Sequence, residues 1–497
     1  MRLLQILSKR SVLLGIFIYF DLLWLTLIIL NIIQVPLWLS LFLRLFRLLV
    51  MLYIVYREDD AGYKIIWLVF IGMSPFFGTL FYLLIGKKAP SRKLYRSFKK
   101  HEHVYDNHSQ SENVLTTLND LSLQGQMRYF IDQGFSIYHN SDIKYYSLGD
   151  LWYEDLLQAL RNAKRFIFME YFIVEKGYLF DQVLDILVQK VKEGVEVRFL
   201  FDDVGSLMTL PDNFEKEIKK LGIDIVSFNP LLLSVVTNHR DHRKITVVDG
   251  EIGFCGGLNL ADEYINRKVR FGHWKDTAVR VTGEAVNSLT LLFLDIFDVA
   301  KKVETDYKDY FIGATSNTQG YVIPYGDTPL DEETVGENVY LNMIFQAKKY
   351  IYIFTPYLII DDQMKKSLIL AAKRGVDVRI CVPGIPDKKM IFRMTRSYYR
   401  VLKEFGVRIY EYTPGFLHGK SIVCDDQYAV VGTTNLDYRS LFLHFECGVW
   451  FALNDAVLDV KQDFLNTIEK SKEITDVKQG TFSRIFDFLF RIFAPLL

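Results

Sequence analysis

NHRDHRKITVVDGEIGFCGGLNL, residues 238–260, has a second copy later in the chain, GFLHGKSIVCDDQYAVVGTTNL, residues 415–436. Both copies contain the pattern His-x-Lys-x4-Asp, followed by a pair of small residues and an Asn at the same spacing. A pattern of this length that occurs twice indicates an internal duplication. The shared residues are His242, Lys244, Asp249 and Asn259 in the first copy, and His418, Lys420, Asp425 and Asn435 in the second.

The duplication extends well upstream of both motifs. Each copy has the same predicted order of elements before the motif: strand, helix ending in a Gly, strand, helix, strand. This order predicts an α/β protein with two tandem halves of similar α/β/α fold. The matched segments are 162–174 and 346–360, 191–203 and 372–384, and 219–230 and 402–414.

The spacing within the motif predicts where its side chains point. Alternating residues predict a strand, in which His and Lys at i and i+2 lie on one face, and the Asp falls at the following turn. Two halves that meet face to face present two imidazoles and two ammonium groups to one pocket. Further donors come from Asn259 and Asn435 and from the backbone at Gly256, Gly257 and Gly432. Such a pocket suits a phosphate.

Two histidines at one phosphate explain why the motif occurs twice. Phosphodiester exchange through a covalent intermediate needs a nucleophile on one side of phosphorus and an acid on the opposite side. Histidines in different protonation states fill these two roles. We therefore expect one half to supply the nucleophile and the other the acid, and the symmetry of the sequence leaves open which half does which.

Other polar residues have two interpretations. Asp249 and Asp425 are either participants in the chemistry or turn residues beside a strand. Asn259 and Asn435 are either phosphate donors or turn residues. The sequence LDYRS contains residues that form either a buried ion pair or substrate contacts, namely Asp437, Arg439 and Ser440. Several histidines have no partner in the other half and are interpreted as incidental: His101, His103, His108, His139 and His444.

The N-terminal residues 1–86 are almost continuously hydrophobic and predict a membrane region of two or three helices, at about 11–33, 37–56 and 65–85. Segments 11–33 and 65–85 are long enough to cross a hydrocarbon core of about 30 Å. Segment 37–56 is ambiguous because it carries Arg44 and Arg47 near its middle. We expect a multi-pass protein of the cell membrane.

Positive charges flank this region on both sides, which the positive-inside rule places in the cytoplasm. The catalytic portion is therefore expected to be cytoplasmic, with segment 37–56 lying in the interface or else spanning against the rule. A basic linker is expected at 87–125, the two halves at 126–310 and 311–475, and an amphipathic helix that contacts lipid or caps a core at 476–497.

Composition narrows the possible partners. The 497 residues include 59 Lys+Arg and 59 Asp+Glu, so the chain has no net positive charge that would attract a nucleic acid. No His, Cys, Asp or Glu residues stand at the spacing of a zinc site, a calcium loop or a P-loop, and we predict no metal and no cofactor. The four cysteines are too scattered for a disulfide framework and predict buried thiols: Cys255, Cys381, Cys424 and Cys447.

The sequence resembles the phospholipase D superfamily, whose members carry two His-x-Lys-x4-Asp motifs, and within it the bacterial cardiolipin synthases. The resemblance covers nearly the whole chain. It rests on both motifs, on the hydrophobic N-terminus and on GGLNLADEY (256–264), HWKDTAVRVTGEAV (273–286), GTTNLDYRSLFLHFE (432–446) and the ending RIFAPLL (491–497). It implies two phospholipase D-like halves that condense two phosphatidylglycerol molecules into cardiolipin and release glycerol, without a metal.

The resemblance also implies roles for individual residues. His242 attacks the first phosphorus to give a phosphohistidine, while His418 protonates the departing glycerol and then acts as a base. Asp276 and Glu446 match positions where the family pairs a carboxylate with each imidazole. Two phosphate-binding positions depart from the superfamily, which often has Ser there: Gly257 and Thr433.

The alternative functions fall into three classes: a related hydrolase or transferase, a nuclease, and a non-catalytic scaffold. A phospholipase D-type hydrolase would use water as acceptor, and a related transphosphatidylase would use a different donor or acceptor lipid. A nuclease fits a neutral, membrane-anchored chain poorly, and a scaffold would be expected to have lost part of one motif, whereas both motifs are intact. The sequence leaves the acyl-chain preference and the oligomeric state open.

Overall fold

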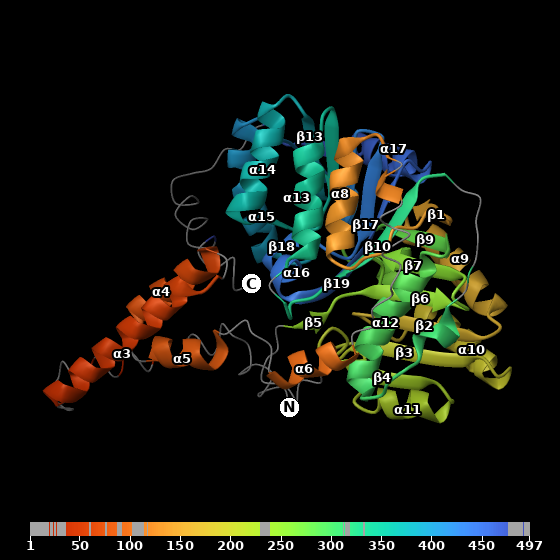
Figure 1. Cartoon of the computed structure of the whole chain (residues 1–497), viewed down its shortest axis with the longest axis horizontal. Coiled ribbons are helices and arrows are strands. Elements are labelled where there is room, and N and C mark those ends of the chain that lie inside the picture. Colours follow the sequence, from red (N-terminus) through yellow and green to blue (C-terminus); the bar gives the residue numbers. More distant parts are fainter. Residues whose placement is uncertain are drawn as a thin grey trace. The chain divides into compact units, whose positions relative to one another are not determined.

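The computed structural model describes residues 36–58, 61–74, 77–86, 92–101, 114–116, 118–228, 239–311, 313, 319–331 and 333–475, together with residues 19, 23, 26 and 491 (Figure 1). The chain forms two compact units. One comprises Met1–Pro90 and Thr481–Leu497, and the other comprises Ser91–Gly480.

The larger unit contains two mixed sheets built on one plan (Figure 1). The first has the order β1-β9-β7-β6-β2-β3-β4, and β2, β3 and β4 are parallel to one another whereas the other neighbours are antiparallel. Its strands are β1 (Ser141–Tyr146), β2 (Phe166–Tyr171), β3 (Glu196–Asp202), β4 (Asp224–Phe228), β6 (Lys244–Val248), β7 (Ile252–Gly256) and β9 (Ala278–Gly283).

The second sheet repeats this order as β10-β19-β17-β16-β11-β13-β14, with β20 added at the edge and β5 paired to β19. The predicted internal repeat is therefore confirmed at the level of the fold. The compact unit spans both halves, and the limits predicted for each half stay a prediction. The strands are β10 (Tyr321–Asp327), β11 (Tyr350–Phe354), β13 (Asp377–Pro383), β14 (Arg408–Tyr412), β16 (Ser421–Cys424), β17 (Tyr428–Gly432), β19 (His444–Ala452) and β20 (Ser471–Glu473).

Helices cover both sheets, and one hydrophobic core runs through both halves. That core joins Phe168 and Val247 of the first half to Phe354, Val423 and Phe445 of the second. The helices are α8 (Leu121–Asp132), α9 (Gly149–Asn162), α10 (Tyr178–Lys192), α11 (Phe214–Lys220), α12 (Val286–Lys301), α13 (Val335–Gln346), α14 (Asp362–Lys373), α15 (Lys389–Glu404), α16 (Tyr438–Phe442) and α17 (Ala456–Glu469), with the 3-10 turns η1 (Asp262–Ile265) and η2 (Tyr307–Tyr310).

The segment predicted as a basic linker contains structure. Helix α6 (Arg92–His101) lies within it, and α8 begins before its end. Phe98 of α6 stacks on Phe445, with ring centroids 4.9 Å apart, and meets Phe228 edge-on at 6.5 Å. Because Phe445 and Phe228 belong to different halves, α6 packs where the two halves join.

The smaller unit contains three described helices, α3 (Leu37–Tyr56), α4 (Ala61–Met73) and α5 (Phe77–Ile85). The predicted single span at 65–85 is wrong, because the structure divides it into α4 and α5. Trp67 of α4 lies 5.7 Å from Phe81 and 5.2 Å from Tyr82 of α5, so the two helices fold back on each other. The sequence has Pro75 between them, and proline disfavours helix in the residue before it and removes a donor.

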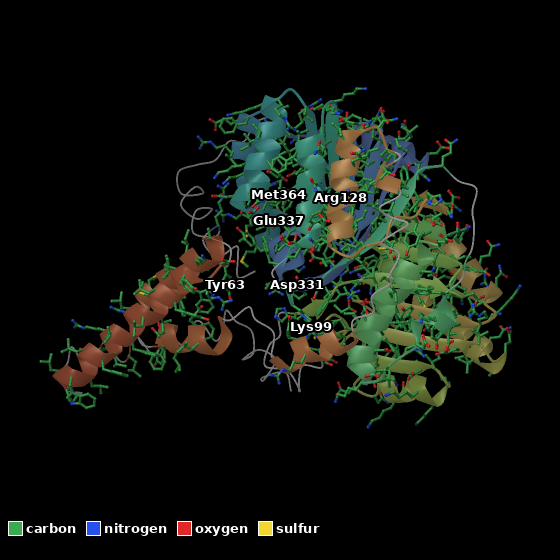
Figure 2. The ribbon with its side chains drawn as sticks, in the orientation of Figure 1. Tyr63, Lys99, Arg128, Asp331, Glu337 and Met364 are labelled. Carbon is green, nitrogen blue, oxygen red and sulfur yellow. The ribbon has the colours of Figure 1, made fainter. Side chains whose placement is uncertain are left out.

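Tyr63, which Figure 2 labels on α4, donates its hydroxyl proton to the carbonyl of Gly86 at 2.8 Å and closes this hairpin. Among the described residues, α3 alone is long and apolar enough to cross a membrane, and most of its apolar side chains are exposed. Within the described part of the chain the structure thus shows one such helix, which is the segment that Arg44 and Arg47 had made ambiguous, and the multi-pass arrangement stays a prediction. The span predicted at 11–33 and the helix predicted at 476–497 lie outside the described residues.

Candidate active site

Two short parallel pairings connect the halves. β8 (His273–Lys275) of the first half pairs with β15 (Gly415–Leu417) of the second, and β5 (Arg240–Asp241) pairs with the start of β19. In each pairing, one strand leads directly into a motif histidine, while the other contains a carboxylate, Glu446 in β19, or ends just before one, Asp276 after β8. The backbone therefore places a histidine of one half beside an acid of the other half.

Both motif histidines form a dyad with the acid of the opposite half. Nδ1 of His242 lies 2.9 Å from each carboxylate oxygen of Glu446, and Nδ1 of His418 lies 2.6 Å from Oδ2 of Asp276. Both imidazoles are buried, and both carboxylates are fully buried. A carboxylate at Nδ1 holds the proton there and leaves Nε2 free for chemistry.

The histidines lie just before a strand and not within it, contrary to the prediction. His242 falls between β5 and β6, and His418 falls between β15 and β16, because the chain passes there from a pairing between halves into its own sheet. His and Lys nevertheless meet at both motifs. Lys244 donates to the carbonyl of His242, and Lys420 donates to the carbonyl of His418 at 2.5 Å.

Burial and neighbouring cations tune the four basic groups. Burial, followed by the charges of Lys244 and Lys420, holds the pKa of His242 well below its ordinary value. Burial and Lys420 lower the pKa of His418 to about 4, although Asp276 opposes them. Burial also lowers the pKa of Lys244 to about 8 and that of Lys420 to about 7. The unliganded site therefore holds neutral imidazoles at neutral pH.

Asp249 and Asp425, predicted among the catalytic residues, are turn residues. Asp249 accepts hydrogen bonds from the backbone N–H groups of residues 164–166 at 2.8, 2.7 and 2.9 Å, and Asp425 does the same with residues 348–350 at 2.6, 2.8 and 2.8 Å. Both adopt left-handed backbone conformations, with φ of 56° and 54°. With their oxygens occupied by backbone donors, they fix the entry into β2 and β11 instead of meeting a substrate.

The two repeated asparagines differ. Asn259 accepts from the N–H of Ile173 at 2.9 Å and donates to the hydroxyl of Tyr264 at 2.7 Å, so it supports the fold, and its role as a phosphate donor stays a prediction. Oδ1 of Asn435 is buried and has no hydrogen-bond partner within the described part of the chain. Among the described residues, the amide oxygen is therefore occupied in Asn259 and unoccupied in Asn435.

Gly257 and Thr433, predicted to bind phosphate, support the carboxylates. A Cβ at Gly257 would lie 2.1 Å from Oδ1 of Asp276, so only a glycine, which has no side chain, leaves room for this carboxylate. The hydroxyl of Thr433 donates to Oε2 of Glu446 at 2.5 Å. The two equivalent positions therefore serve the dyads in different ways.

Ser440 and His444 lie near Glu446 in roles that the sequence did not predict. The hydroxyl of Ser440 donates to Oε1 of Glu446 at 2.7 Å, while Asp437 caps α16 by accepting from the N–H groups of Arg439 and Ser440. His444, interpreted as incidental, has its ring centroid 5.5 Å from that of His242 and its Nδ1 3.6 Å from Oε1 of Glu446. Its position two residues before Glu446 on one strand was the available signal.

A cavity of about 410 Å³ lies behind the dyads. Its wall includes Arg243, which lies between His242 and Lys244 in the chain, and Phe445, which precedes Glu446; both side chains face away from the dyads. Lys99 and Asp331, labelled in Figure 2, also line the cavity. The cavity therefore adjoins the candidate active site from the back and does not contain it.

Comparison with known proteins identifies the group to which this chain is related. Residues 156–272 and 340–468 match the family described as cardiolipin synthase, PLD-like domain, and residues 45–87 match the phospholipase D-nuclease N-terminal family. A cardiolipin synthase of Alkalihalophilus pseudofirmus is 36% identical over 445 residues, covering 87% of this chain and 88% of the relative. The chain belongs to the cardiolipin synthase family of the phospholipase D superfamily.

Two further proteins are similar to this chain. An uncharacterized protein of Streptococcus mutans is 42% identical over 460 residues, covering 90% of this chain and 99% of the relative. The crystal structure of a Haemophilus influenzae phosphatidylserine synthase superposes with a TM-score of 0.58 at 15% identity, covering 79% of this chain and 98% of that one. This last likeness shows a shared fold.

Proposed function

We propose that the protein is a cardiolipin synthase, which transfers a phosphatidyl group from one phosphatidylglycerol to another and releases glycerol. The observation that carries the proposal is the pair of crossed dyads, His242 with Glu446 and His418 with Asp276. The curated relatives named cardiolipin synthase support the choice of substrate.

In the first step, Nε2 of His242 attacks phosphorus and forms a P–N bond. The P–O bond to the glycerol headgroup breaks, and His418 donates a proton to the departing oxygen. Lys244 and Lys420 balance the negative charge of the phosphoryl oxygens. Binding of the anionic phosphate raises the pKa of both imidazoles, which allows His418 to carry the proton that it delivers.

In the second step, a terminal hydroxyl of a second phosphatidylglycerol loses its proton to His418. The oxygen attacks phosphorus, the P–N bond breaks, and His242 is regenerated with cardiolipin as product. Glu446 and Asp276 keep each ring oriented through both steps and stabilise its charged form.

The apolar helix α3 supports a location at the cell membrane, where both lipid substrates reside. We place the catalytic unit on the cytoplasmic side, because the basic residues that follow the apolar region favour that side. The exposed apolar surface of α3 matches a lipid environment and would be costly in water.

The test is to incubate the purified full-length protein in nanodiscs with phosphatidylglycerol alone, in the presence of a chelator, and to follow lipids and glycerol by mass spectrometry. Equal amounts of cardiolipin and glycerol are expected. Phosphatidic acid without cardiolipin would instead identify water as the acceptor and the protein as a hydrolase.

Variants of the histidines test the mechanism independently of the choice of substrate. Replacing His242 or His418 by Ala should abolish turnover, whereas His139→Ala, at an exposed histidine, should not. Substantial turnover in either of the first two variants would contradict the two-histidine mechanism.

A further inference from the structure

His444 gives one of the two dyads a third ligating side chain. We infer that His242, His444 and Glu446 bind one divalent cation of the zinc class, and that this cation inhibits the enzyme. Among the described residues this is the one group of three His, Cys, Asp or Glu side chains whose ligand atoms come together, all within 4.8 Å of one another. The sequence prediction of no metal site missed it, because the ligands come from both halves.

The separations between the ligand atoms suit a small cation. Nδ1 of His242 lies 2.9 Å from the carboxylate oxygens of Glu446, and Nδ1 of His444 lies 3.6 Å from Oε1. Zinc bonds of about 2.0–2.1 Å at tetrahedral angles separate neighbouring ligand atoms by about 3.3 Å. These two separations lie on either side of this value, and all ligand atoms of the group lie within 4.8 Å of one another.

His444 is buried without serving the fold through its ring nitrogens. Its side chain is 10% exposed, and neither ring nitrogen has a hydrogen-bond partner in the described part of the structure. Glu446 Oε1, 3.6 Å from Nδ1, is an ion-pair partner only if the ring is protonated. Burying an imidazole without hydrogen bonds is costly, and a bound cation would give one nitrogen a ligand bond.

The second dyad lacks such a third ligand. The residue equivalent to His444 in the first half is Trp274, which also lies two positions before the acid and pairs with the strand leading to a motif histidine. Its indole Nε1 faces Oδ2 of Asp276 at 3.4 Å, and an indole N–H cannot ligate a metal. Cation binding is therefore expected at His242 and not at His418.

The charges around the site define the class of cation and the strength of binding. Two imidazoles and one carboxylate select zinc, copper or nickel over magnesium or calcium, which prefer oxygen ligands. The ammonium groups of Lys244 and Lys420 oppose any cation here, since both act electrostatically on His242. The site is thus suited to weak, reversible binding and not to a resident cofactor.

Inhibition follows from the tautomer of His242 and rests on the proposed function. A cation at Nδ1 occupies the lone pair of that nitrogen, so the single proton of the neutral ring moves from Nδ1, where Glu446 held it, to Nε2. Nε2 then has no lone pair with which to attack phosphorus.

The test measures binding and inhibition separately, on the full-length protein in nanodiscs. Binding of Zn²⁺ is measured by equilibrium dialysis, and Co²⁺ serves as a spectroscopic probe of the ligand set. Inhibition is measured with phosphatidylglycerol, each variant being compared with its own rate in chelator. The variants are His444→Asn, His444→Phe and, as matched control, His139→Asn at an exposed histidine.

We expect one Zn²⁺ per chain at this site, and loss of His444 should weaken both binding and inhibition by about tenfold or more, while His139→Asn leaves them unchanged. Equal Zn²⁺ affinity in wild type and His444→Asn, or equally tight Mg²⁺ binding, would overturn the site. Binding that depends on His444 but leaves the rate unaffected would overturn the inhibition. Such binding in a protein without activity on phosphatidylglycerol would retain the site and refute the proposed function.

Discussion

The two dyad carboxylates receive different donors. Glu446 accepts from the hydroxyls of Thr433 and Ser440 in addition to His242, whereas Asp276 accepts from the N–H of Thr277 and faces the indole of Trp274. Two motifs with the same residues therefore lie in two environments. This asymmetry is what a reaction with one nucleophile and one acid requires.

Replacing either carboxylate by its amide should reduce turnover strongly. In Asp276→Asn and Glu446→Gln the imidazole loses the partner that holds its proton on Nδ1, and kcat is expected to fall about 10²–10⁴-fold. The rate of cardiolipin formation measures this effect. Glu404→Gln, at an exposed position, is the control, and a variant that keeps its kcat would show that the dyad is dispensable.

The activity should depend on pH through Lys420, whose pKa burial lowers to about 7. As pH rises through this value the free enzyme loses the positive charge that meets the phosphate, so kcat/KM for phosphatidylglycerol should decline on the alkaline side. In Lys420→Arg the charge persists to far higher pH, and the decline should move to higher pH. An unchanged alkaline limb in Lys420→Arg would assign it to another group.

At the scale of residues, the sequence identified the dyad members but not their pairing. Asp276 and Glu446 were singled out by resemblance, yet nothing along the chain indicates that each serves the histidine of the other half. Asn259 and Asn435 are equivalent in sequence, and only the structure shows that the first is hydrogen-bonded to Ile173 and Tyr264. His444 was overlooked because the repeat places Trp274 at its equivalent position.

Turns after the motif strands connect the site to the scaffold. Asp249 and Asp425 each hold three consecutive backbone N–H groups at the start of a central strand. The strand that follows each motif histidine, β6 or β16, is thereby tied to the strand beside it in the sheet.

Replacing Asp249 by Ala should therefore destabilise the fold more than it impairs the chemistry. Buried donors lose their acceptor, and Ala must adopt a left-handed backbone, so the free energy of unfolding should fall by about 2–4 kcal/mol. Thermal unfolding in detergent, followed by tryptophan fluorescence, measures the loss. His242→Ala provides the opposite pattern, with no turnover and nearly unchanged stability, and a stable but inactive Asp249→Ala would return this aspartate to the catalytic group.

At the scale of elements, the repeat predicted both sheets and the turn positions, because hydrophobic periodicity and turn residues can be recognised in the sequence. The pairings β5 with β19 and β8 with β15 were not predictable, since they join short strands from different halves. The hairpin of α4 and α5 was missed for a related reason. Hydropathy gave a continuous apolar segment, and the break near Pro75 became evident only in the structure.

The larger unit builds its complete site within one chain. Both histidines, both carboxylates and both lysines come from residues 242–446 of a single compact unit. We therefore predict that mixing inactive His242→Ala protein with inactive His418→Ala protein restores no cardiolipin synthesis. Recovery of activity on mixing, measured over a range of protein concentrations, would show that two chains share their sites.

The crossed dyads also bear on how such a molecule could have arisen. A protein with one half alone would carry a histidine and a carboxylate that cannot reach each other, and only a second copy related by twofold symmetry could complete its site. Fusing two such copies preserves the site and then frees each half to change alone. Such independent change would leave different residues at equivalent positions of the two halves. Two such positions are Trp274, equivalent to His444, and Gly257, equivalent to Thr433.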